Sequence, residues 1–63
     1  MDDSTLSKIA LNVYQMKNEG KQPLDCLRYA TDEGRLEYPD AVWLVTRVLK
    51  LDDDAVFEME ESY

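Results

Sequence analysis

The side chains that could do chemistry in this sequence are one thiol and many carboxylates. Cys26 is the only cysteine, and the 63 residues contain no histidine. A nucleophilic cysteine needs a neighbouring base to take its proton, so catalysis by Cys26 has almost no support. At helical spacing, Cys26 lies beside Leu24 and Leu27, which predicts a small core residue. We therefore expect no enzymatic activity.

Three consecutive aspartates, Asp52 to Asp54, form the best cluster of metal ligands in the sequence. A calcium-binding EF-hand loop alternates its ligands, turns on a glycine and ends in a glutamate, and that spacing is missing here. Structural zinc sites need several cysteines or histidines. We expect no metal and no other cofactor, and we predict that the aspartates cap a helix and form a solvated charge run.

The charge is distributed unevenly along the chain. Residues 1–51 carry eight acids and seven bases, a net charge of −1, whereas residues 52–63 carry six acids and no base. The formal net charge of −7 therefore comes almost wholly from the C-terminal segment. Such a charge is repelled by a phosphate backbone and attracted by a basic surface on another protein.

The length of the chain indicates a single helical domain, 1–63, with an acidic C-terminal segment, 52–63. A lone cysteine is typical of a reducing compartment, and the acidic N-terminus does not look like a signal peptide. No apolar run reaches the roughly 18 residues of a membrane-spanning helix. We expect a cytoplasmic protein that makes no membrane contact.

Hydrophobic periodicity predicts an all-α fold, a small three-helix bundle with room for a short fourth C-terminal helix. We expect helices near residues 5–19, 23–33 and 40–51. Residues 53–63 fit a fourth helix, a strand or a frayed tail; the helix is favoured because a lone strand would have no partner. Glycine stops and proline starts bound the three helices, namely Gly20, Gly34, Pro23 and Pro39.

The first helix is predicted to be amphipathic and to be capped by Asp3, Ser4 or Thr5. Its apolar face comprises Leu6, Ile9, Ala10, Val13, Tyr14 and Met16.

The third helix is the one around which the chain is organised. Its apolar residues cover an arc of about 180°, wider than a surface helix needs, so it should contact two neighbours. Val45 lies near the middle of this arc and should be buried. Trp43 lies opposite, among Thr46, Arg47 and Lys50. Trp43 either stays in water, is covered by its own chain, or contacts a partner. The side chains that could cover it are Phe57, Met59 and Tyr63, and Arg47 could also lie over the ring as a cation–π neighbour.

These patterns favour a small protein-interaction module, an adaptor or inhibitor that binds a basic or apolar surface on another protein, or a second copy of the chain. Aromatic residues, methionine and arginine are enriched at interfaces. The predicted protein-binding residues are Trp43, Arg47, Lys50, Phe57, Glu58, Met59, Glu60, Glu61 and Tyr63. We expect removal of residues 58–63 to weaken partner binding and to leave the helices intact.

The alternative is a helix-turn-helix-like transcription regulator that binds DNA as a dimer. Three short helices match its outline, and the third exposes Arg47 and Lys50. The net charge opposes this alternative, because DNA readers rely on many phosphate contacts. In size and acidity the chain is similar to small accessory proteins of bacteriophages and other mobile elements, many of which inhibit a host factor; no motif carries this likeness.

Overall fold

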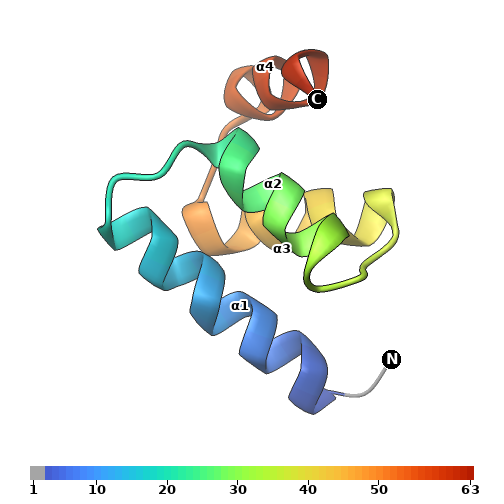
Figure 1. Ribbon diagram of the computed structural model, residues 1–63. Helices are drawn as coiled ribbons and strands as arrows, with labels where there is room; N and C mark the ends of the chain where they lie inside the picture. The colour runs from blue at the N-terminus through green and yellow to red at the C-terminus, as the bar shows by residue number, and fades with distance from the viewer. Residues whose placement is uncertain (1–2) are drawn as a thin grey trace.

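The computed structural model describes residues 3–63, which fold into four α-helices and no strand (Figure 1). In chain order these are α1 (Asp3–Asn18), α2 (Pro23–Asp32), α3 (Tyr38–Leu49) and α4 (Asp53–Ser62). The all-α prediction is confirmed, and the fourth helix is present. Within the described residues, no helix combines the length and the apolar character that crossing a bilayer requires.

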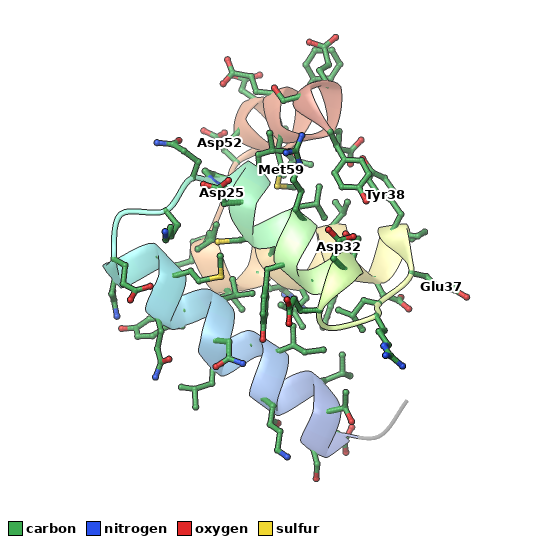
Figure 2. All side chains as sticks on the ribbon, viewed as in Figure 1. Asp25, Asp32, Glu37, Tyr38, Asp52 and Met59 are labelled. Atoms are coloured by element: carbon green, nitrogen blue, oxygen red, sulfur yellow. The ribbon has the colours of Figure 1, made fainter. Side chains whose placement is uncertain are left out.

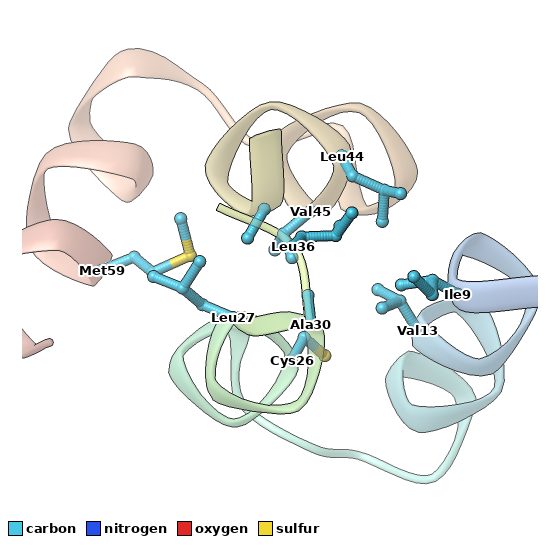
Figure 3. Packing of buried hydrophobic residues seen from close by; sticks show 10 residues of the cluster. Ile9, Val13, Cys26, Leu27, Ala30, Leu36, Leu44, Val45 and Met59 are labelled. Carbon is cyan, nitrogen blue, oxygen red and sulfur yellow. The ribbon is translucent and has the colours of Figure 1, made fainter. Parts of the chain in front are cut away.

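One hydrophobic core joins the four helices. The Cα atoms of the chain have a radius of gyration of 10.5 Å. Helices α1, α2 and α3 pack against one another, and α4 packs on α2. Figure 3 shows α4 and α1 on opposite sides of the α2–α3 pair. Helix α3 contacts both α1 and α2, as its wide apolar arc predicted, and Val45 is fully buried at the centre of that arc. The core comprises Ile9, Val13, Cys26, Leu27, Ala30, Leu36, Ala41, Leu44, Val45 and Met59.

Helix α1 begins earlier than predicted. Asp3, Ser4 and Thr5 were expected to cap it, but they are already helical, and Met1 and Asp2 lie outside the described residues. At the other end, Gly20 has a φ of +86°, so its predicted role as a left-handed helix stop is confirmed. Tyr14 was assigned to the apolar face, but its side chain is 50% exposed, because it lies at the edge of that face.

The predicted role of Gly34 as the stop of α2 is wrong. The helix ends at Asp32, and the left-handed residue that follows is Arg35, with a φ of 56°. Gly34 is needed for a different reason. A Cβ at this position would lie 2.7 Å from the carbonyl oxygen of Ala30 and 2.9 Å from Cδ1 of Ile9. The missing side chain therefore lets α1 approach the end of α2.

Helix α3 is shifted by two residues from the predicted range 40–51. It begins at Tyr38, although Pro39 disfavours the helical conformation at the residue that precedes it. Glu37 is the N-cap of the helix. It ends at Leu49 because Lys50 takes a left-handed conformation, with a φ of 54°. This stop uses no glycine, so the sequence carries no direct signal for it.

Helix α4 is capped and packed, which excludes a frayed tail. The backbone N–H of Ala55 donates to Oδ1 of Asp52 at 2.8 Å, the capping role predicted for the aspartates. Met59 points from α4 towards α2 and faces Leu27 in the core (Figures 2 and 3). Because Met59 belongs to the core, removal of residues 58–63 would remove part of that core. The expectation that this removal leaves the helices intact therefore needs correction.

Candidate functional site

The predicted binding residues do not form one site. Trp43 and Arg47 lie on α3 where it borders α1, and Lys50 is the C-cap of the same helix. Residues 57–63 belong to α4, which packs on α2 at the other side of the molecule (Figure 1). We therefore treat the outer face of α3 and the outer face of α4 as two separate surfaces.

Trp43 is 57% exposed, and the groove beside it is lined by residues of α1 and α3. The guanidinium carbon of Arg47 lies 5.1 Å from the centre of the indole ring, a cation–π contact within one helix. The expected cation–π contact with Arg47 is therefore present. Phe57 is itself exposed, Met59 lies in the core and Tyr63 packs on Tyr38, so none of these three covers the indole ring. The role of Trp43 in a contact with a partner stays a prediction.

A shallow apolar groove of about 280 Å³ lies between α1 and α3, next to Trp43. Sequence analysis placed Leu6 and Ala10 on the apolar face of the first helix and did not predict that they line a groove. Both side chains are only partly buried. The groove is lined by Leu6, Ser7, Ala10, Trp43, Leu44, Arg47 and Val48.

Charges on the outer face of α3 are ordered along the helix. Asp40, Trp43 and Arg47 are all exposed and are spaced three and four residues apart, so they lie on one side of the helix. Glu37 at the N-cap and Lys50 at the C-cap continue the series at its two ends, and Glu37 projects outward in Figure 2. The face therefore runs from acidic, through aromatic, to basic.

Phe57 is the most exposed large apolar residue among residues 3–63, at 63%. The positions three and four residues away on either side are its neighbours on a helix surface. All four are acids, namely Asp53, Asp54, Glu60 and Glu61, and all are exposed. We call these five residues the α4 surface. The spacing was already visible in the sequence, but it carries meaning only once α4 is known to be a helix.

The last turn of α4 carries acids where bases would be more stable. Carboxylates near a helix N-terminus are stabilising, and Asp53 and Asp54 occupy that end. Glu60 and Glu61 lie near the C-terminus, where the helix dipole disfavours negative charge, and that turn has no base. Local helix stability therefore does not account for these two glutamates.

Met59 and Tyr63 differ from the other predicted α4 residues. Met59 is 4% exposed and supports α4 from inside, so it is not available to a partner. The Tyr63 ring lies 5.0 Å from the ring of Tyr38, and its hydroxyl donates to Oγ1 of Thr31 at 3.1 Å. Burial, then Glu60 and Tyr63, raise the pKa of Tyr38. Tyr63 therefore attaches the end of the chain to α2 and α3, although half of its surface remains exposed.

Glu58 lies outside the α4 surface, about 100° around the helix from Phe57. Together with Met59 and Ser62, it lines a second groove, of about 230 Å³, between α4 and the start of α2 at Gln22 and Pro23.

Cys26 is fully buried in the core, as its position predicted. Burial, and secondarily the charge of Asp25, raise the pKa of its thiol, which disfavours the reactive thiolate. Among residues 3–63, no three histidine, cysteine or acidic side chains lie together in a way that could hold a metal ion.

Comparisons with protein families, with curated proteins and with solved structures found no match to this chain.

Proposed function

We propose that this protein is a small protein-interaction module, an adaptor or inhibitor, whose α4 surface binds a basic surface on another protein. The observation that carries the proposal is the exposed Phe57 among four carboxylates. An aromatic side chain buries a large area when a partner covers it. Binding energy in interfaces is concentrated in such central residues, while the surrounding rim excludes water.

The acids around Phe57 define the chemistry of the partner. Residues 52–63 carry six acids and no base, so their field attracts lysine- and arginine-rich surfaces and speeds the encounter with them. The partner should therefore offer an apolar pocket surrounded by basic side chains. A nucleic-acid-binding protein has such basic surfaces, and occupation by α4 would compete with phosphate and inhibit it.

The placement of Glu60 and Glu61 supports a binding role. The dipole of α4 and the neighbouring acids disfavour both charges in the free protein. Natural sequences depart from local helix preferences mainly at functional or strained sites. Basic side chains of a partner would relieve this repulsion upon binding.

The test is affinity capture from the native cells, followed by mass spectrometry and binding measurements with the purified partner. Phe57→Ala should weaken the binding without unfolding the protein. Glu61→Lys should raise the melting temperature, because it places a base in the last turn, and should weaken the binding at low salt, where charge attraction is least screened.

The matched control is Asp32→Lys, which makes the same charge change at the last turn of α2. It should leave the binding nearly unchanged. Equal effects of Glu61→Lys and Asp32→Lys would mean that net charge, and not the α4 surface, governs the interaction. Full binding by Phe57→Ala would reject the aromatic centre of the surface.

The DNA-binding alternative has less support. A recognition helix contacts bases with its N-terminal residues, and at that end α3 exposes Glu37 and Asp40. Its bases, Arg47 and Lys50, lie at the opposite end. Fluorescence anisotropy with labelled DNA at low salt tests this alternative, and tight binding there would favour it over the α4 proposal.

A further inference from the structure

We infer that the outer face of α3 is a self-association surface, on which two copies of this chain pair their α3 helices antiparallel about a two-fold axis near Trp43. This inference concerns the face opposite α4 and does not depend on the function proposed for the α4 surface. It rests on the order of charges along α3, on the groove beside Trp43 and on the position of the acidic helix.

The charges on this face are complementary to themselves. In an antiparallel pair related by a two-fold axis, the contacts are reciprocal. With the axis level with the peptide bond between Trp43 and Leu44, Asp40 of each copy lies level with Arg47 of the other. In the same register, Glu37 lies level with Lys50. All four charged side chains are exposed in the single chain. The reverse, parallel arrangement would place like charges together, which is destabilising.

The shape of the face is complementary as well. Trp43 projects into solvent, with Arg47 over its ring, beside the apolar groove between α1 and α3. A projecting side chain next to a groove is the arrangement that an isologous contact uses, because each copy supplies both parts. In the antiparallel pair, Trp43 of one copy covers the groove of the other and is itself covered.

The apolar character of the face extends along α1. Leu11 and Tyr14 are exposed and follow Ser7 and Ala10 of the groove wall at intervals of four residues, so they lie on the same side of α1. The apolar surface offered to a second copy therefore continues from the groove along α1.

The distribution of charge favours a second copy at this face over one at the acidic α4. Residues 1–51 have a net charge of −1, and the six remaining acids belong to the segment that contains α4. Helix α4 packs on α2, on the side away from α1. Two copies that meet through α3 hold their acidic helices apart, which keeps repulsion between the copies low. The resulting dimer presents two α4 surfaces, so it could bind a two-fold partner with higher avidity.

Sedimentation equilibrium at physiological salt, from about 1 µM to about 1 mM protein, tests the pairing. The wild-type mass should rise from monomer towards dimer across this range. Tryptophan emission should shift to the blue over the same concentrations, because Trp43 is the only tryptophan. Trp43→Ala should remain monomeric and folded. A wild-type protein that is monomeric at every concentration overturns the inference.

A charge exchange tests the register. Asp40→Arg and Arg47→Asp each place like charges opposite one another, so each single variant should weaken the dimer at least tenfold. The double variant restores opposite charges and should regain most of the affinity. Far-UV circular dichroism checks that all three variants remain folded.

Failure of the double variant to recover affinity overturns the antiparallel register. The matched control is Arg28→Asp, which reverses an exposed arginine on α2 and should leave the dimer unchanged. Phe57→Ala should also leave it unchanged; a monomeric Phe57→Ala would assign self-association to α4 instead. Because the α4 variants and the α3 variants affect different measurements, the two proposals can fail separately.

Discussion

Ile9 of α1 packs against the bare backbone of Gly34. A Cβ added to Gly34 would lie 2.9 Å from Cδ1 of Ile9 and 2.7 Å from the carbonyl oxygen of Ala30. Ile9 could adjust its rotamer, but the carbonyl belongs to the end of α2 and cannot move without displacing the helix. The contact between α1 and α2 therefore depends on a position that has no side chain.

Gly34→Ala should destabilise the protein by about 1–3 kcal/mol, the usual cost of overpacking a tight site. In a domain of this size, each kcal/mol lowers the melting temperature by about 4–8 °C. Thermal unfolding followed by circular dichroism measures the effect. The control is Gly20→Asn, because Gly20 has open space around it and asparagine tolerates its positive φ; an equal loss at both positions would contradict the packing explanation.

Val45→Asp should leave the chain unfolded. Val45 is fully buried where α3 meets the core, and an unpaired buried charge is strongly destabilising. A single core of this size rarely supplies more than about 3–5 kcal/mol of stability. Loss of the helical circular dichroism signal at room temperature checks the expectation. Trp43→Asp, on the exposed side of the same helix, should remain folded under the same conditions.

Truncation should cost much more stability at Met59 than at Phe57, although both residues belong to α4. Met59→Ala removes a core side chain of α4 and should cost about 2–5 kcal/mol, whereas Phe57→Ala removes an exposed one and should stay within about 0.5 kcal/mol. Denaturant titration measures both. Amide hydrogen exchange should show faster exchange in α4 for Met59→Ala, because α4 is held mainly by α2. A large loss for Phe57→Ala would show that Phe57 is part of the core.

Stability should fall at alkaline pH, and Tyr38 should contribute to the fall. Burial, then Glu60 and Tyr63, raise the pKa of Tyr38 in the folded protein, so the folded state holds this proton more tightly than the unfolded state does. The contribution is fully present below the ordinary tyrosine pKa of about 10 and is lost as the pH rises through the higher folded value. Tyr38→Phe should flatten this part of the stability profile; an unchanged profile would assign the loss to other groups.

The sequence determined which residues form helices and which side of each helix is apolar, because both follow from spacing within a few turns. The buried position of Val45 and the left-handed Gly20 could be predicted in this way. The exposed position of Phe57 follows from the spacing only if residues 53–63 form a helix, which the sequence left open. The boundaries of α3 could not, since the helix includes Tyr38 before a proline and stops at a left-handed Lys50. Local preferences oppose both features, so packing of the whole chain must stabilise them.

The tertiary structure decided which neighbour covers each apolar side. Helical periodicity places Met59 and Trp43 on their helices, but it does not say where α4 docks. Because α4 packs on α2, Met59 enters the core and Trp43 stays uncovered beside the groove of α1 and α3. The role of Gly34 has the same origin, since its close neighbour Ile9 is 25 positions away in the sequence. Contacts between distant segments depend on the packing of complementary surfaces, which no short window of the sequence contains.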